Sequence, residues 1–168
     1  FEATVSTSGD QIAIAPGYLQ KEWISKDGRR YFHYQMDNKM LNFYSIISGR
    51  FEVMRDSLND VNLEIYYHRD HTYNLERMMA SLKKSLAYYE ANFSPYQFTQ
   101  LRVVEFPKTH GTFAQAFANT VPFSEAIGFI AKVDEDNPNG IDYPYSVIAH
   151  EFAHQWWAHQ VIGAGVKG

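Results

Sequence analysis

The chain of 168 residues contains no cysteine, which excludes disulfide bonds, cysteine-ligated zinc and cysteine nucleophiles. It has no run close to the ~20 apolar residues that a membrane-spanning helix needs, and no signal peptide opens it. Its net charge is −4, and no stripe of basic residues interleaved with aromatics crosses it. We therefore expect no nucleic-acid partner and no membrane span within these residues.

Hydrophobic residues make up 45% and aromatic residues 16% of the chain, which is enough for a packed core in one ordinary domain or two small ones. The chain begins at Phe1, without an initiator Met, and it ends at Gly168. We interpret it as a piece of a longer protein.

The first 66 residues or so are predicted to form antiparallel β structure. Segments rich in aromatic and β-branched residues alternate with turn residues in this region. The predicted strands are 31–36, 41–47 and 61–66. The predicted turns are Asp27-Gly28, which is a strong hairpin signal, Asp37-Asn38 and Ser48-Gly49.

A helix is predicted over residues 73–93, because this stretch has neither Gly nor Pro and its apolar residues recur every three or four positions. We interpret it as a packing helix that Pro95 ends. Strands are then expected at 100–106 and 126–133, with a long loop at 107–124 between them. The acidic stretch 134–140 lacks the ligand spacing of a calcium loop, and so predicts a solvated loop.

A second helix is predicted to begin near Asp142, to run over 144–162 and to end at Gly163. Asp142 can cap its N-terminus, and Pro144 is tolerated in the first turn. Apolar residues lie on most sides of this helix, so we expect it to be buried. Buried polar side chains need partners, and a metal ion would supply them for the histidines and the glutamate within it.

This helix contains His150-Glu151-Phe152-Ala153-His154, which reads H-E-x-x-H. His150 and His154 project from one helix face, one turn apart, so both rings can reach one zinc ion at about 2.0–2.1 Å. Glu151 lies at the flank of that face, where it can act as general base toward a water on the ion. The motif therefore predicts two zinc ligands, His150 and His154, and a catalytic base, Glu151. The alternative is a pair of core histidines with satisfied hydrogen bonds.

A catalytic zinc ion needs a third protein ligand. The metzincin pattern would place Gly at 157 and His at 160, but the chain has Trp157 and Gln160 there. His159 lies about 140° round the helix from His154, and we interpret it as structural. No Asp or Glu follows the motif in this chain. The remaining option is a ligand beyond Gly168.

The continuation to Trp157 gives H-E-F-A-H-Q-W-W, which resembles the H-E-x-A-H-Q-W signature of the membrane alanyl aminopeptidase family, a group of gluzincin peptidases. In that family the third ligand is a Glu on the next helix, roughly twenty residues after the second His. The resemblance thus implies one zinc ion, a peptide substrate and a third ligand beyond Gly168. It also implies that this piece is inactive, or nearly so, by itself.

A second element of that family, G-x-M-E-N-W-G, stands about 25 residues before the zinc motif. Residues 122–128 occupy this place, with Glu125 and Gly128 kept and the other positions changed. The resemblance implies that Glu125 binds the free α-amino group of a substrate, and the alternative is a solvated loop glutamate. The family's oxyanion-stabilising Tyr lies downstream of the motif, so Tyr143 and Tyr145 are interpreted as packing residues.

By the same resemblance the chain is an α+β protein. Residues 1–60 are expected to form the C-terminal part of an antiparallel β-sheet saddle domain. Residues 61–168 are expected to form the incomplete N-terminal part of a thermolysin-like catalytic domain. The implied function is a zinc metallopeptidase of aminopeptidase type, which hydrolyses peptide bonds near a free N-terminus with zinc-activated water.

The residues after the motif look most like a bacterial branch in which the peptidase domain is fused to the membrane spans of an ABC-type permease in the same polypeptide. That placement implies a membrane-attached extracytoplasmic domain, with a cytoplasmic location as the alternative. Two other functions stay open. One is a catalytically weak, peptidase-like binding or sensor domain of a membrane transporter, and the other is a non-catalytic structural domain with two buried histidines.

Overall fold

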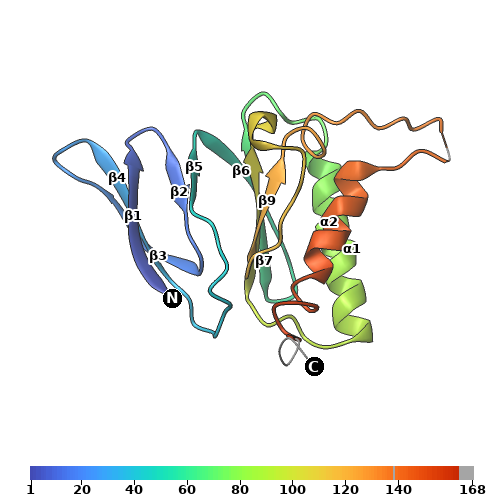
Figure 1. Cartoon of the computed structure of the whole chain (residues 1–168), viewed down its shortest axis with the longest axis horizontal. Helices are drawn as coiled ribbons and strands as arrows, with labels where there is room; N and C mark the ends of the chain where they lie inside the picture. The colour runs from blue at the N-terminus through green and yellow to red at the C-terminus, as the bar shows by residue number, and fades with distance from the viewer. Residues whose placement is uncertain (138, 163–168) are drawn as a thin grey trace.

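A computed structural model describes residues 1–137 and 139–162 of the chain (Figure 1). The strands are β1 (Glu2–Ser8), β2 (Ile12–Ile14), β3 (Tyr18–Ile24), β4 (Arg29–Gln35), β5 (Ile47–Gly49), β6 (Phe51–Leu58), β7 (Val61–His68), β8 (Gln100–Phe106) and β9 (Thr120–Ser124). The helices are α1 (Leu75–Asn92) and α2 (Tyr143–Ala153), with a 3-10 turn, η1, at Lys108–His110. The α+β class expected from the sequence is confirmed.

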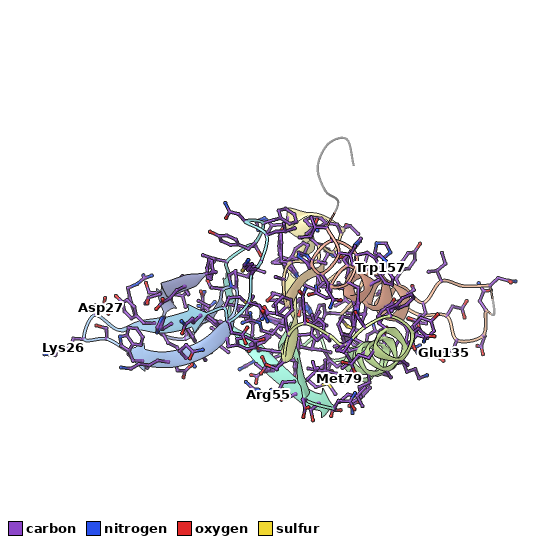
Figure 2. All side chains as sticks on the ribbon, turned by 90° about the horizontal axis from the view of Figure 1, so that it is seen from below. Lys26, Asp27, Arg55, Met79, Glu135 and Trp157 are labelled. Atoms are coloured by element: carbon purple, nitrogen blue, oxygen red, sulfur yellow. The ribbon has the colours of Figure 1, made fainter. Side chains whose placement is uncertain are left out.

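The N-terminal part of the molecule is an antiparallel three-stranded sheet with the order β1-β4-β3. Asp27-Gly28 turns the chain between β3 and β4, as predicted, and Gly28 has a φ of +79°, which favours glycine. This hairpin projects at one end of the molecule, with Lys26 and Asp27 at its tip and Glu135 at the opposite end (Figure 2). A ribbon of β2 and β5 lies between this sheet and the rest of the chain (Figure 1).

The second part is built on a four-stranded mixed sheet with the order β6-β7-β8-β9. β6 and β7 form an antiparallel pair, whereas β7, β8 and β9 run parallel to one another. The two helices pack side by side on one face of this sheet, away from the N-terminal strands (Figure 1). Because β8 and β9 are parallel, their carboxyl ends meet at the same edge of the sheet.

The main core lies between the four-stranded sheet and the two helices. Its side chains that are at most 1% exposed include Leu63, Ile65, Leu101 and Val103 from the strands, Met78, Leu82 and Leu86 from α1, and Ile148 and Phe152 from α2. Burial of each such side chain stabilises the fold by about 1.5–3 kcal/mol. α2 is therefore held against α1 and the sheet by one face, which sets the direction of its other face.

Arg102 joins the two parts of the molecule. Its side chain is 1% exposed, and Nη2 donates hydrogen bonds to the carbonyl oxygens of Ala15 and Gly17 at 2.9 and 2.8 Å. Nη2 also donates to Oδ1 of Asn119 at 3.1 Å. A buried guanidinium needs such partners because desolvation of a charge is costly. The segment between β2 and β3 is therefore tied to β8 and to the loop before β9.

The strand predicted at 126–133 is wrong, and β9 lies inside the segment predicted as a loop. Gly128 packs against the ring of Phe123, where an added Cβ would lie 2.6 Å from a ring carbon, and Phe129 is fully buried. The apolar residues of 126–133 therefore enter the core as a tight turn. Pro122 is tolerated in β9 because β9 is the last strand in the order of its sheet.

The strand predicted at 41–47 is also wrong, as is the turn at Ser48-Gly49. Most of the segment forms no strand, and β5 begins at its last residue and pairs with β2. Phe43 is half exposed and packs edge-on against the ring of Phe117 at 4.7 Å. The aromatic residues that suggested a strand here make side-chain contacts without a backbone partner.

The other predicted elements of regular structure are confirmed. α1 matches the helix predicted over 73–93, and β8 has the predicted bounds. β4 and β7 match the strands predicted at 31–36 and 61–66 within two residues. No helix among the described residues is long and apolar enough to cross a bilayer.

Candidate metal-binding sites

The H-E-x-x-H motif lies at the C-terminal end of α2. Asp142 caps the helix as predicted, because its side chain accepts a hydrogen bond from the backbone N–H of Tyr145 at 3.0 Å, and Pro144 stands in the first turn. The predicted extension over 154–162 is wrong, since the helix ends at Ala153 and the chain continues in turns. Gly163, the predicted end, lies outside the described residues.

α2 is not buried on most sides, which corrects that expectation. Ile148 and Phe152 are buried on the face toward α1, whereas His150 is exposed and His154 is only half-buried. The tyrosine hydroxyl of Tyr89 on α1 donates to the carbonyl of Ala149 at 3.0 Å, which marks the contact between the two helices. The two histidines are therefore open to solvent, as a site that takes up an ion and a substrate requires.

His150 and His154, here called the helix pair, point their rings at one another. Their Nε2 atoms are 3.3 Å apart, and the ring planes are nearly perpendicular. Two ligands at about 2.0–2.1 Å from a tetrahedral ion lie about 3.3–3.4 Å apart. Nδ1 of His154 donates to the carbonyl of Trp157 at 3.1 Å, which leaves the Nε2 lone pair free for a metal. The separation of the two Nε2 atoms is therefore compatible with one shared zinc ion.

Glu151 lies beside the helix pair and is 7% exposed. Burial raises the pKa of its carboxyl above the ordinary value, and the nearby rings of His150 and His154 and the backbone of Ala116 oppose this shift. A raised pKa brings a carboxyl closer to neutral pH, where a general base can both accept and return a proton. The environment of Glu151 therefore suits the role predicted for it.

Two residues after the motif tie it to the loop before β9. Gln155 is fully buried, donates to the carbonyl of Phe117 at 2.9 Å and accepts from the N–H of Asn119 at 3.0 Å. Nε2 of His159 donates to the carbonyl of Ala116 at 3.2 Å, and burial lowers the pKa of this imidazole. His159 thus has a structural hydrogen bond, in keeping with its interpretation from the sequence.

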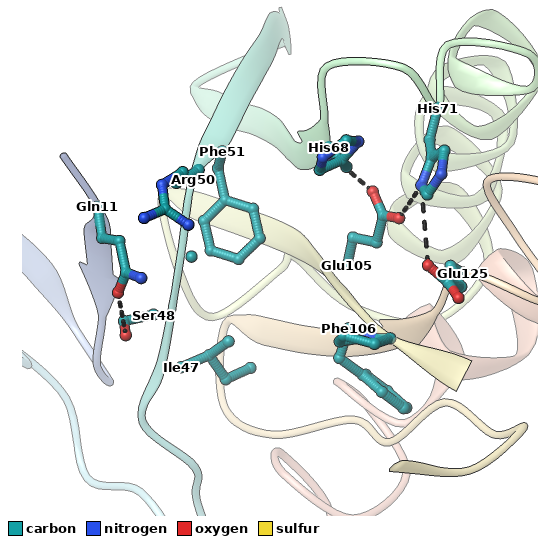
Figure 3. A pocket seen from close by; sticks show the side chains of 12 residues that line it. Gln11, Ile47, Ser48, Arg50, Phe51, His68, His71, Glu105, Phe106 and Glu125 are labelled. Carbon is teal, nitrogen blue, oxygen red and sulfur yellow. Dashed lines mark hydrogen bonds and ion pairs between the residues drawn. The ribbon is translucent and has the colours of Figure 1, made fainter. Parts of the chain in front are cut away.

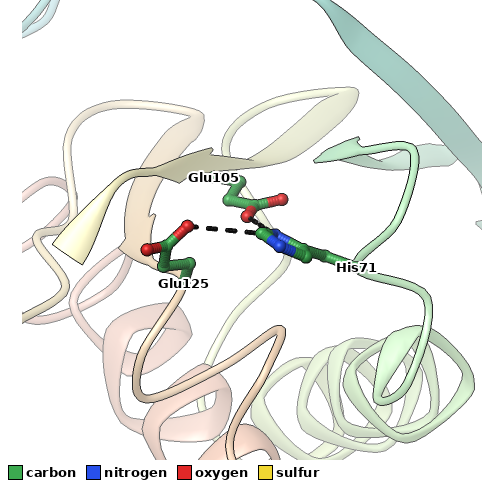
Figure 4. Close-up of side chains that lie close together, drawn as sticks. All are labelled: His71, Glu105 and Glu125. Atoms are coloured by element: carbon green, nitrogen blue, oxygen red, sulfur yellow. Dashed lines mark hydrogen bonds and ion pairs between the residues drawn. The ribbon is translucent and has the colours of Figure 1, made fainter.

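Among residues 1–137 and 139–162, no third His, Asp or Glu completes a metal-binding group with the helix pair. The one group of three such residues found there lies elsewhere. It consists of His71, Glu105 and Glu125, here called the strand-edge cluster, and it is shown in Figure 4. Nothing in the sequence pattern pointed to this cluster, because its members come from three separate segments.

The strand-edge cluster is compact and partly buried. Nδ1 of His71 donates a short hydrogen bond to Glu105 and lies 3.9 Å from Oε2 of Glu125. Glu105 also accepts from the backbone N–H of His68 at 2.6 Å. Burial raises the pKa of the Glu105 carboxyl, although the hydrogen bonds from His68 and His71 oppose this shift.

A pocket of about 400 Å³ opens beside the strand-edge cluster (Figure 3). Besides the cluster, its lining comes from the ends of β7 and β8, from the segment before β2, from β5 and from the start of β6. The lining side chains include Gln11, Ile47, Arg50, Phe51 and Phe106. The cluster therefore faces a cavity between the two parts of the molecule, with space for water or a small ligand.

The structure groups Glu125 with His71 and Glu105, and not with the helix pair. Its side chain is 17% exposed and also accepts from the backbone N–H of Lys108 at 3.2 Å, so it is not a freely solvated glutamate. No hydrogen bond or ion pair of the described residues joins Glu125 to the H-E-x-x-H motif. The amine-binding role predicted for Glu125 stays a prediction.

Comparison with known proteins assigns no family, because no protein-family model matches the chain and no curated protein matches it.

Proposed function

We propose that this chain carries the zinc-binding helix of a zinc metallopeptidase of aminopeptidase type. The observation that supports this most is the 3.3 Å separation of the two Nε2 atoms of the helix pair. It matches the spacing of two ligands on a tetrahedral zinc ion, and the buried carboxylate of Glu151 stands beside them. The third ligand is proposed to be the Glu that the family resemblance places after residue 168.

A bound zinc ion would supply an acidified water and would polarise the carbonyl of a peptide bond. Glu151 is placed to accept a proton from that water and to return it to the departing amine. The hydrogen bond from His154 to the carbonyl of Trp157 holds the ring in the orientation that the motif needs. Gln155 holds the turn after the motif against the loop before β9.

The aminopeptidase type rests on the resemblance of residues 150–157 to the membrane alanyl aminopeptidase family. The same resemblance supports a location outside the cytoplasm, on a polypeptide with membrane spans elsewhere. Peptides with free and blocked N-termini test the aminopeptidase type, because a peptidase that needs a free N-terminus cleaves free peptides but leaves blocked ones intact.

A second candidate function is a peptidase-like domain that binds or senses a peptide with little turnover. One observation favours it. Glu125, the predicted anchor for a substrate's amino group, is engaged by His71 and by the N–H of Lys108. A substrate amine would have to displace these partners to reach the carboxylate.

The experiment compares the full-length polypeptide with its Glu151→Gln and His150→Ala/His154→Ala variants. Zinc content is measured by elemental analysis, and turnover with peptides that have free or blocked N-termini. We expect Glu151→Gln to keep its zinc and to lower kcat by about 10²–10⁴-fold, because removal of a general base costs this much. The exposed Glu52 provides a matched control, and Glu52→Gln should keep full activity.

Each result separates the candidates. If His150→Ala/His154→Ala loses no zinc relative to the unchanged protein, the helix pair is not a zinc site and both functions are wrong. Zinc at the helix pair without turnover that depends on Glu151 favours the binding or sensor domain. Cleavage of blocked peptides at the same rate as free ones removes the aminopeptidase type and the amine-binding role of Glu125.

A further inference from the structure

The strand-edge cluster is assembled by two parallel strands and the turn before α1. Glu105 is the last residue but one of β8, and Glu125 directly follows β9. The backbone N–H of Glu125 donates to the carbonyl of Phe106 at 2.9 Å, which holds the two strand ends together. His71 lies in the turn after β7, where its N–H donates to the carbonyl of His68 at 2.8 Å. Three distant segments thus direct one ligand atom each to the same point.

The distances within this cluster suit one metal ion. Two atoms that each lie about 2.1 Å from an ion are at most about 4.2 Å apart. The 3.9 Å between His71 and Glu125 is within this limit, whereas the hydrogen bond between His71 and Glu105 would open and give up its proton when the ion binds. All three ligand atoms lie within 4.8 Å of one another. On a tetrahedral ion the ligand atoms lie about 3.3–3.4 Å apart, so the Glu125 carboxylate would move toward the other two ligands by up to about 1.4 Å to complete the set.

The charges of the cluster favour a divalent cation. Two carboxylates meet one imidazole, and the Glu105 side chain is only 5% exposed, so a charge there needs a partner. Arg50 also lines the pocket, but its guanidinium binds Asp10 at 2.5 Å. A divalent ion with a neutral imidazole would bring the net charge of the group to zero.

The pocket provides the remaining coordination positions. Its volume of about 400 Å³ has space for one or more waters on the ion. In Figure 3, the cluster stands on one side of the pocket, and Ile47 and Phe51 line the side toward the N-terminal strands. The cluster is therefore accessible to an ion from solvent, while part of its surroundings is apolar.

We propose that His71, Glu105 and Glu125 bind one divalent transition-metal ion, and that Zn²⁺ fits best because the ligand set mixes one imidazole with two carboxylates. Ca²⁺ and Mg²⁺ fit less well, since both prefer sites built from oxygen atoms alone. The ion cross-links the turn before α1 to the ends of β8 and β9. It shares no residue with the helix pair, so the molecule has a second metal site.

The experiment measures Zn²⁺ binding to the full-length polypeptide after its metals are removed with a chelator. His150→Ala/His154→Ala removes the helix pair, so that calorimetric titration reports the strand-edge cluster alone. We expect this variant to bind one zinc ion per chain and to show a higher Tm with zinc. In the same background, Glu125→Gln should raise the Kd at least about 100-fold, more than the loss of an outer-shell partner costs. The exposed His110 gives the control, and His110→Ala should bind zinc unchanged.

Failure of this inference and failure of the proposed function give different results. If His150→Ala/His154→Ala binds no zinc, the strand-edge cluster is only a hydrogen-bonded ion pair, and the peptidase proposal is unaffected. An unchanged Kd in Glu125→Gln also overturns the second site. Zinc that remains in His150→Ala/His154→Ala but disappears with Glu125→Gln supports the second site, whether or not Glu151 supports turnover. Far-UV circular dichroism confirms that each variant is folded.

Discussion

The two His/Glu groups of this molecule are built in opposite ways. The helix pair comes from positions four residues apart on α2, so local helix geometry alone brings His150 and His154 together. In the strand-edge cluster, His71 and Glu105 are 34 residues apart in the sequence. That cluster exists only once the parallel sheet has formed. The contrast shows that a group of side chains within one helix can be predicted from spacing, whereas a group at a sheet edge depends on topology.

The two groups also differ in the position of their carboxylates. Glu151 stands beside the helix pair without being needed as a ligand, so it is free to move a proton. In the strand-edge cluster both carboxylates face the imidazole, and no acidic group of the cluster is left over. This difference matches the two proposals, in which the helix pair supports chemistry on a substrate and the strand-edge cluster cross-links three segments.

The largest effect on stability is expected from a change in the packing of α2, the helix that carries the helix pair. Phe152 is fully buried and contacts the rings of Tyr89, Tyr96 and Trp156. We expect Phe152→Ala to lower the free energy of unfolding by about 3–5 kcal/mol, because it leaves a cavity in the core. Urea denaturation followed by circular dichroism measures this change.

The same variant should affect the two groups differently. In conditions where Phe152→Ala remains folded, zinc affinity of the strand-edge cluster should be unchanged, because that cluster makes no contact with α2 in the described residues. Phe43→Ala is the matched control. Because Phe43 is half exposed, this substitution should lower the free energy of unfolding by about 1 kcal/mol or less. A loss from Phe152→Ala as small as that of the control would show that α2 is not anchored through this ring.

A smaller effect is expected at Gln155, which ties the end of the motif to the loop before β9. Gln155→Ala leaves the carbonyl of Phe117 and the N–H of Asn119 without this partner in a buried place. We expect a loss of about 2 kcal/mol in the free energy of unfolding, since buried unpaired polar groups cost roughly 1–3 kcal/mol each and a water can replace part of the side chain. Thermal denaturation gives the value.

The control for Gln155→Ala is Gln160→Ala, because Gln160 makes its side-chain hydrogen bonds at the surface. Removal of those exposed bonds should change the free energy of unfolding by no more than about 0.5 kcal/mol. Equal losses in the two variants would mean that the buried hydrogen bonds of Gln155 stabilise the fold no more than exposed ones do.

Local signals in the sequence are sufficient to predict the start of α2 and the proximity of its two histidines. The cap at Asp142 and the spacing of the two histidines are both properties of one helix. The sequence does not predict the end of α2, because the residues after Ala153 keep an apolar helical pattern, although Gln155 and His159 form hydrogen bonds with the loop before β9. Hydrogen bonds between distant segments cannot be predicted from the periodicity of apolar residues.

The strand-edge cluster could not be predicted, because its position depends on β9. The sequence places Pro122 in that segment, which argues against a central strand, and the following apolar run looked like the better strand. Only the parallel pairing of β8 with β9 brings Glu105 and Glu125 to one edge. With β9 assigned to a loop, Glu125 had no geometric link to His71.

The smallest expected effect concerns the N-terminus of α2. Asp142→Ala removes the side chain that accepts from the N–H of Tyr145, and we expect a loss of about 1 kcal/mol in the free energy of unfolding. The same carboxylate also binds Arg77 at 2.5 Å, but both side chains are about 30% exposed, so this ion pair contributes little. Thermal denaturation measures both contributions together.

Asp142→Asn separates the cap from the ion pair, because an amide oxygen can still accept from the N–H of Tyr145 while the charge that attracts Arg77 is gone. If the cap is responsible, Asp142→Asn should retain most of the stability that Asp142→Ala loses. An equal loss in the two variants would assign the effect to the ion pair. In either case zinc affinity of the strand-edge cluster should not change, since its three ligands are held by β8, β9 and the turn before α1 and do not depend on how α2 begins.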